Sequence, residues 1–106
     1  MTAVPIRRGD VWLARLDKTR PLVILTRDPL ASMLNAVIAA PITSTVRNLS
    51  TEVPVGPGDG VRVPAVANLD NVQLVARSRL VRRVGRVKST TMQAICQALA
   101  IAVDCG

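Results

Sequence analysis

Short runs of apolar residues, separated by polar turns, make up most of this chain. Two of them, residues 22–25 and 36–40, are too short for typical helices and rich in β-branched side chains, which predicts buried core strands. Arg20 lies at the start of the first strand, and Thr43 belongs to a group of hydroxyl side chains at the end of the second. We therefore expect Arg20 and Thr43 to meet at the rim of a barrel.

Turn residues divide the rest of the chain into further short strands. Gly9 and Asp10 turn into a strand over residues 11–16, and the tight connection that follows predicts a hairpin with the strand at Arg20. Pro54 favours an edge position for its strand, because proline donates no hydrogen bond to a neighbour. The later strands are expected at residues 51–55, 61–66, within 67–75 and at 81–87, with turns at 56–60 and near 77–79.

Two helices are predicted, one short and one near the end of the sequence. Asp28 and Pro29 suit the N-cap and the first position of a short helix that runs to about Met33. Thr90 and Gln93 form a capping-box pattern at the start of the second helix. Apolar side chains then recur at helical spacing, which indicates core or dimer packing and not a cofactor site: Met92, Ile95, Cys96, Leu99, Ala102 and Val103.

Many short strands and one terminal helix predict a mainly β fold with a C-terminal helix (α+β), shaped as a small, strongly curved barrel. Residues 1–106 are expected to form a single domain, large enough to bury a core and small enough for dimerisation to add stability. The 49% of hydrophobic residues exclude disorder. Trp12 is the sole aromatic residue and is expected in the core, whereas the segment up to Arg8 reads as a loose arm.

The charge balance points to a polyanionic partner. Fourteen basic residues against seven acidic ones give a net charge of +7, which favours nucleic acid or an acidic protein. With so few aromatic residues for stacking, binding to nucleic acid should depend steeply on salt. The longest apolar run is far too short to span a membrane, and no apolar segment follows the basic N-terminus, so we expect a cytoplasmic protein with no membrane partner.

The residue types that are missing exclude several kinds of site. There is no His, which removes the common general bases, Ser-His or Cys-His pairs, and the usual metal ligands. There is no phosphate-binding Gly-rich motif, no dinucleotide fingerprint and no paired acidic motif of a two-metal nuclease. Cys96 and Cys105 would lie about 13 Å apart along one helix, beyond disulfide reach, so both are expected to be reduced. No metal and no cofactor is predicted.

Arginine and hydroxyl groups can still cleave RNA. The 2′-hydroxyl of RNA is an internal nucleophile, so a protein needs mainly to align it and to stabilise the charge that develops on phosphate. Arg20 and Thr43 are the candidates for this work. Because arginine stays protonated, the role we assign to Arg20 is that of phosphate clamp, and the general base is left unassigned.

Further polar residues are candidates for binding RNA. Ser44, Thr45 and Arg47 follow Thr43 in a polar loop. Amide and carboxylate side chains suit the edges of unstacked bases, but they equally suit a turn at a strand end, and Asn68, Asp70 and Asn71 fit both readings. Five arginines lie at positions 77, 79, 82, 83 and 86. They can follow the phosphate backbone, bind an acidic partner or simply face solvent. We assign Arg79 and Arg82 to RNA binding.

Several blocks occur in an order and spacing that resemble the MazF/PemK-type toxins, the endoribonucleases of bacterial type II toxin–antitoxin pairs. The first three blocks are Arg-Gly-Asp-Val-Trp at 8–12, Arg-Pro-Leu-Val-Ile-Leu at 20–25 and Ala-Pro-Ile-Thr-Ser-Thr at 40–45. Later blocks are Thr-Glu-Val-Pro-Val at 51–55, Asn-Leu-Asp-Asn at 68–71 and the arginine-rich strand at 79–87. Together they span nearly the whole sequence.

This resemblance implies an SH3-like barrel of the PemK/CcdB type that forms a homodimer. It also implies metal-independent, sequence-specific cleavage of single-stranded RNA that leaves a 2′,3′-cyclic phosphate and a 5′-hydroxyl. The family's catalytic Arg and Thr correspond to Arg20 and Thr43, and the expected partner is an acidic, MazE-like antitoxin whose C-terminal segment occupies the RNA groove. Many members carry a Glu just before Arg-Pro, whereas this sequence has only Asp17 nearby.

Two other functions fit the same composition. One is a non-catalytic, CcdB-like inhibitor of gyrase, which the basic surface and the lack of a visible acid–base pair allow. The other is a small basic barrel that binds RNA without cleaving it. Cleavage that depends on Arg20 distinguishes the endoribonuclease from both.

Overall fold

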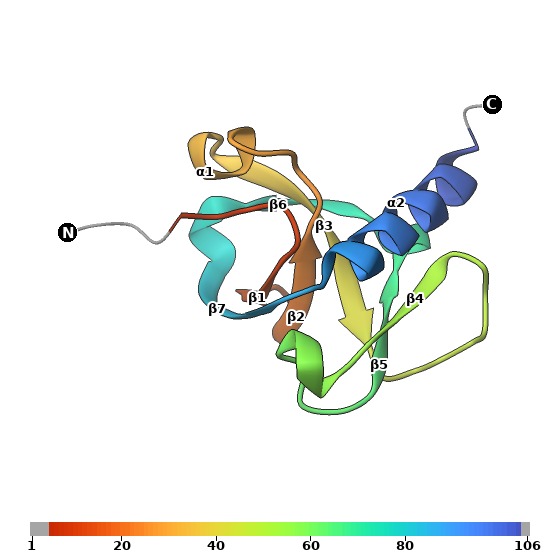
Figure 1. Cartoon of the computed structure of the whole chain (residues 1–106). Helices are drawn as coiled ribbons and strands as arrows, with labels where there is room; N and C mark the ends of the chain where they lie inside the picture. The colour runs from red at the N-terminus through yellow and green to blue at the C-terminus, as the bar shows by residue number, and fades with distance from the viewer. Residues whose placement is uncertain (1–4, 105–106) are drawn as a thin grey trace.

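The computed structural model describes residues 5–104, which form a curved antiparallel sheet with one long helix across it (Figure 1). The strands are β1 (Asp10–Arg15), β2 (Thr19–Ile24), β3 (Ala36–Thr43), β4 (Glu52–Val55), β5 (Ala65–Asn68), β6 (Gln73–Ala76) and β7 (Leu80–Arg86). The helices are α1 (Leu30–Met33) and α2 (Ser89–Val103), and short 3-10 turns span Pro57–Asp59, Leu69–Asn71 and Arg77–Arg79. The predicted mainly β fold with a C-terminal helix is confirmed.

The eight-residue strand β3 is the centre of the sheet and changes partners along its length. One edge of β3 pairs with β2, while the other edge pairs first with β6 and then, from Ile42, with β5. The main strand order is β4-β5-β3-β2-β1-β7. Because two different strands share one edge of β3, the sheet bends there and wraps into the expected barrel-like shape (Figure 1).

Both faces of the central strands are buried, which explains their unbroken apolar runs. Successive side chains of a strand point to opposite faces. Val11 and Val23 pack in a cluster that includes Ile95 of α2, whereas Trp12 and Leu22 pack in a second cluster on the other face. Trp12 is only 6% exposed, so its predicted place in the core is confirmed.

Most predicted strands are present, and one begins later than expected. The hairpin of β1 and β2 pairs Ala14 with Arg20, and Pro54 lies in β4, which has a sheet partner on one side among the described residues. The prediction of a strand over 61–66 is wrong for its first part, because regular pairing starts only at Ala65. Pro64 lacks the donor that ladder pairing needs, and it directly precedes the start of β5.

The N-terminal segment is more ordered than the sequence suggested. Residues 1–4 lie outside the described part of the structure, but Ile6 is buried beside Trp12 and Leu22. The backbone N–H of Arg7 donates to Oδ2 of Asp10 at 2.9 Å. The predicted loose arm is therefore wrong for residues 6–8.

Both helix-cap predictions are wrong. The helix α1 begins at Leu30, and among the described residues no side chain caps it. Asp28 instead accepts a hydrogen bond from the backbone N–H of Arg8. The helix α2 begins at Ser89, one residue before Thr90, and it likewise has no side-chain cap in the described chain.

The predicted apolar stripe of α2 is mostly confirmed, although the end of the helix differs. Ile95 is fully buried and Leu99 packs against the same cluster, as does Ala98, which lay outside the predicted stripe. Val103 is 57% exposed. Cys96 is half-buried and free, whereas Cys105 lies outside the described residues. Neither described helix has the length and apolar character that a membrane span requires.

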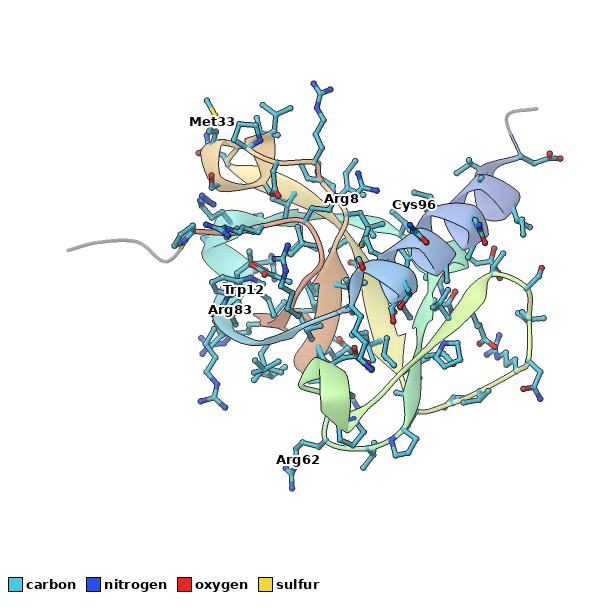
Figure 2. The ribbon with its side chains drawn as sticks, in the orientation of Figure 1. Arg8, Trp12, Met33, Arg62, Arg83 and Cys96 are labelled. Carbon is cyan, nitrogen blue, oxygen red and sulfur yellow. The ribbon has the colours of Figure 1, made fainter. Side chains whose placement is uncertain are left out.

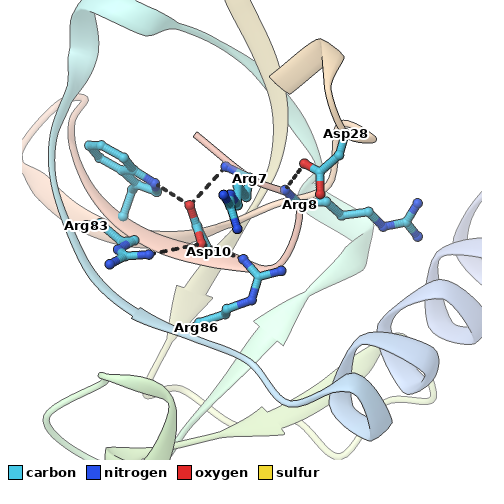
Figure 3. A network of polar contacts seen from close by, with 7 residues as sticks. Arg7, Arg8, Asp10, Asp28, Arg83 and Arg86 are labelled. Carbon is cyan, nitrogen blue, oxygen red and sulfur yellow. Dashed lines mark hydrogen bonds and ion pairs between the residues drawn. The ribbon is translucent and has the colours of Figure 1, made fainter. Parts of the chain in front are cut away.

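Asp10 ties the N-terminal turn to β7 (Figure 3). Its carboxylate is fully buried, and its Oδ1 accepts a hydrogen bond from Nη1 of Arg86 at 2.8 Å. Nη1 of Arg83 lies 3.9 Å from the same oxygen, and the indole N–H of Trp12 is 3.4 Å from Oδ2. The carboxylate thus joins β1, β7 and the preceding turn, and it has a structural role.

Candidate functional site

Arg20 and Thr43 lie at the same end of two neighbouring strands. The register of β2 and β3 pairs Leu22 with Pro41, and Arg20 and Thr43 each lie two residues beyond this last pair, at the same end of the two strands. Both residues line the same two grooves on the surface. The adjacency of β2 and β3 thus brings together the cation and the hydroxyl that the sequence analysis singled out.

Asp17 holds the guanidinium of Arg20. Nε of Arg20 donates to Oδ1 of Asp17 at 3.1 Å, and Nη2 donates to Oδ2 at 3.2 Å. The hydrogen bonds from Arg20 lower the pKa of Asp17 to about 2, with a smaller contribution from the backbone of Lys18. The same contact raises the pKa of Arg20 above its ordinary value. Arg20 is therefore a fixed positive charge, suited to binding a phosphate and not to accepting a proton.

The hydroxyl of Thr43 is oriented by the loop that follows it. Its Oγ1 accepts a hydrogen bond from the backbone N–H of Thr45 at 3.1 Å. This bond uses a lone pair of the oxygen and leaves the O–H free to donate. An anion bound by Arg20 would lie within the same two grooves as this donor.

The larger groove, called here the basic groove, has a volume of about 710 Å³ and runs between the 60–65 segment, β7 and the Arg20 hairpin. Its floor is largely apolar. No carboxylate lines it among the described residues, and its cations are Lys18, Arg20, Arg62, Arg82 and Arg83. Figure 2 shows Arg62 projecting outward from its loop and Arg83 on β7. The basic groove therefore suits an anionic chain.

The smaller groove, called here the polar groove, has a volume of about 420 Å³ and lies on the other side of Arg20 and Thr43. It contains both carboxylates and amides. Its remaining lining residues are Leu16, Asp17, Pro41, Thr45, Arg47, Glu52, Asn68, Asn71 and Gln73. The two grooves share Arg20 and Thr43, so these residues stand at their junction.

The structure separates the predicted RNA-binding residues into three groups. Ser44 and Arg82 line the basic groove. Four line the polar groove: Thr45, Arg47, Asn68 and Asn71. Asp70 and Arg79 line neither, and both make contacts within the fold.

The contacts of Asp70 and Arg79 are those of structural residues. Asp70 accepts a hydrogen bond from the hydroxyl of Thr51 at 2.5 Å, and its N–H donates to Oδ1 of Asn68. Arg79 donates from Nη1 to the carbonyl oxygen of Arg15 at 3.1 Å. Of the two readings of segment 68–71, the turn accounts for Asp70 and for Oδ1 of Asn68.

Sequence reasoning missed four charged or amide side chains that line the grooves. Lys18 and Arg62 line the basic groove, and Glu52 and Gln73 line the polar groove. Oε1 of Glu52 accepts hydrogen bonds from the backbone N–H groups of Arg47 and Leu49, and so it holds the loop after Thr43. The Thr-Glu-Val-Pro-Val block was the available signal for Glu52; nothing in the local sequence marked the other three.

A contact between two glycines fixes one wall of the basic groove. A Cβ on Gly85 would lie 2.1 Å from the carbonyl oxygen of Asp59, and one on Gly60 would lie 2.3 Å from that of Val84. Gly60 also has φ +90°, which other residues rarely adopt. The turn at 56–60 therefore lies directly on β7.

Within residues 5–104, no group of three His, Cys, Asp or Glu side chains is placed to hold a metal ion.

Comparison with known proteins gives consistent matches over nearly the whole chain. Residues 7–103 match the family described as "PemK-like, MazF-like toxin of type II toxin-antitoxin system". The chain is similar to "Probable endoribonuclease MazF5" of Mycobacterium tuberculosis, with 43% identity over 108 residues that cover 99% of this chain and 98% of the relative.

Solved structures agree with this match. The chain is similar to "Mycobacterium tuberculosis toxin MazF-mt6", with a TM-score of 0.86, 40% identity and coverage of 90% of this chain and 96% of that one. It is also similar to "Endoribonuclease in complex with its cognate antitoxin from Mycobacterial species", with a TM-score of 0.85, 28% identity and coverage of 95% and 97%. The resemblance seen in the sequence is thus confirmed, and the chain belongs to the PemK-like and MazF-like toxins of type II toxin–antitoxin systems.

Proposed function

We propose that this chain is a metal-independent, sequence-specific endoribonuclease that cleaves single-stranded RNA and so inhibits translation and growth. The observation that carries this proposal is the placement of Arg20 and Thr43 at the junction of two surface grooves. The similarity to proteins named endoribonucleases supports it. Residues 1–106 act as one toxin domain, in the cytoplasm, where the RNA substrate is found.

In this reaction the 2′-hydroxyl of the RNA attacks the adjacent phosphorus, and the bond to the 5′ oxygen of the next nucleotide breaks. The products are a 2′,3′-cyclic phosphate and a 5′-hydroxyl. Arg20 binds the phosphate and stabilises the charge that develops on its oxygens, while Asp17 keeps the guanidinium in place. The hydroxyl of Thr43 donates to the same phosphate.

The basic groove suits an acidic antitoxin as well as RNA. A related endoribonuclease is described in complex with its cognate antitoxin. In this chain five cations line the basic groove without a carboxylate among the described residues, and apolar side chains form much of the remaining lining. An acidic segment with apolar side chains would match both features and would cover Arg20, so an acidic, MazE-like antitoxin is the expected inhibitor.

An exposed apolar patch supports a homodimer. Ile38 of β3 and Leu74 of β6 are cross-strand partners, so their side chains share one face of the sheet. The side chain of Leu74 is 72% exposed and that of Met33 is 69% exposed. Figure 2 shows Met33 on the outer side of α1. Arg77 fixes α1 in place by donating to the carbonyl oxygens of Ala31 and Ser32. A second copy of this chain would bury the patch.

The test uses purified protein, single-stranded RNA of mixed sequence and EDTA, and identifies the chemistry of the new ends. Wild-type protein should leave 5′-hydroxyl and cyclic phosphate ends. Arg20→Ala should slow cleavage about 100-fold or more, the usual effect of removing a group that stabilises transition-state charge. Thr43→Ala should also slow it, and Thr43→Ser should retain more activity than Thr43→Ala. Arg27→Ala, which removes an exposed arginine outside both grooves, is the matched control and should cleave normally.

Equal cleavage by wild type and Arg20→Ala, or no cleavage of any RNA, would refute the proposal. DNA breakage that requires gyrase, without RNA cleavage, would select the CcdB-like inhibitor instead. RNA binding without a product would select the non-catalytic barrel.

A further inference from the structure

The two grooves that meet at Arg20 and Thr43 differ in charge and in hydrogen-bonding groups. We propose that the polar groove reads the bases of the RNA on one side of the cleaved bond, with Asn68 and Gln73 as specificity-determining residues, whereas the basic groove holds the backbone on the other side. This inference rests on the proposed endoribonuclease function. It predicts a cleavage motif whose base preferences are set unequally about the cut.

The hydrogen-bonding groups of Asn68 have fixed directions. Its Oδ1 accepts a hydrogen bond from the backbone N–H of Asp70 at 3.0 Å, so the amide orientation is set by the turn. Its Nδ2 carries two N–H donors that are left for a ligand in the polar groove. The side chain therefore presents a donor to an acceptor on a base edge.

Gln73 provides a second amide in the same groove. It is exposed on β6, opposite Ala39, and its side chain has no hydrogen-bond partner among the described residues. Amide side chains offer a donor and an acceptor together, which matches the exposed edges of unstacked bases. The groove thus has the groups that distinguish one base from another.

Charge also favours bases over phosphates in the polar groove. Asp17 and Glu52 line it and offset the charges of Arg20 and Arg47. No carboxylate lines the basic groove among the described residues. Arg20 and Arg83 are paired with Asp17 and Asp10 outside it, but the side chains of Lys18, Arg62 and Arg82 make no hydrogen bond or ion pair in the described part of the chain. These free cations suit phosphate oxygens, which carry no information about sequence.

The position of the junction gives the asymmetry. The phosphate that is cleaved must lie against Arg20 and Thr43, which both grooves share. A strand that crosses this point has its preceding nucleotides in one groove and its following nucleotides in the other. The amides therefore reach bases on only one side of the cut.

The experiment compares cleavage motifs on a pool of single-stranded RNA with randomised sequence, read by sequencing the 5′-hydroxyl ends. Asn68→Asp keeps the oxygen that accepts from Asp70 and replaces the free donor with an acceptor. Gln73→Glu makes the corresponding change at an exposed position that carries no structural contact of its side chain. Arg62→Gln is the matched control in the basic groove, and urea denaturation verifies that each variant is folded.

Asn68→Asp and Gln73→Glu should change base preference about tenfold at positions on one and the same side of the cut. Arg62→Gln should leave the motif unchanged, weaken binding to all sequences alike and reduce the slope of log affinity against log salt by about 0.7. An unchanged motif in both amide variants, or a motif altered on both sides, would overturn the inference while leaving Arg20-dependent cleavage intact. If the wild-type protein cleaves none of the RNA in the pool, the proposed function itself is overturned.

Discussion

Replacing Asp10 with alanine should remove the main polar link between the N-terminal turn and β7. The buried carboxylate accepts hydrogen bonds from the Arg7 backbone and from Arg86, and it lies 3.9 Å from Nη1 of Arg83. Alanine leaves these donors without their acceptor. Since both guanidinium side chains are about half exposed, water replaces the lost partner for them, and this limits the loss.

The magnitude follows from these contacts. The charge-assisted hydrogen bond from Arg86 contributes about 1.5–3 kcal/mol to the free energy of unfolding. Leaving the N–H of Arg7 without its acceptor costs about 1–2 kcal/mol more. The expected loss for Asp10→Ala is about 3–4 kcal/mol, at the lower end of the range for breaking a buried pair. Asp10→Asn keeps one acceptor oxygen and the size of the side chain, so it should lower the free energy of unfolding by about half as much as Asp10→Ala.

Urea denaturation measures these losses, with far-UV circular dichroism and Trp12 fluorescence as independent probes. Trp12 is the sole tryptophan and contacts Asp10, so it reports directly on this region. Asp28→Ala is a matched control, because Asp28 also accepts a backbone N–H of the N-terminal segment but is exposed; it should lose less than about 1 kcal/mol. An Asp10→Ala loss no larger than that of Asp28→Ala would refute the assigned role.

Three further results are expected. Gly85→Ala should lower the free energy of unfolding, measured in urea, by at least about 1–3 kcal/mol, because the new Cβ would overlap the backbone of Asp59. A free energy of unfolding equal to that of the wild type would contradict the contact. In an NMR titration the carboxyl of Asp17 should have a pKa of about 2. Its ion pair with Arg20 should therefore persist above about pH 4 and be lost as the pH falls through about 2. The substitution Arg20→Ala should return the pKa of Asp17 toward 3.8. Leu74→Lys should shift sedimentation from dimer to monomer; an unchanged dimer would place the interface elsewhere.

The elements that the sequence predicted well are those whose signal is local. The hairpin of β1 and β2 and the buried run of β3 follow from alternation, apolar content and turn residues within a few positions. Arg20 and Thr43 could be paired because the strands that carry them are neighbours in both sequence and sheet. The family resemblance then assigned them a role.

The failures involve partners that are distant in the sequence. Asp28 was expected to cap α1, but it binds the backbone of Arg8, 20 residues earlier. One wall of the basic groove depends on the contact of Gly60 with Gly85, and the cation Arg62 follows Gly60 by two residues. Such pairs leave no periodic pattern in the chain, so only the folded structure reveals them.

The absence of histidine from the sequence is consistent with how this site is built. The charge of Arg20 is oriented by Asp17, three residues earlier in the same hairpin, and the hydroxyl of Thr43 by the N–H of Thr45. Both orienting groups are local, while the strands β2 and β3 fix the two side chains relative to each other. Groups held in place before the substrate arrives need no reorganisation during the reaction, which is the condition for strong electrostatic stabilisation. In the proposed reaction, Arg20 and Thr43 would therefore act as a preorganised phosphate-binding pair for a substrate that carries its own nucleophile.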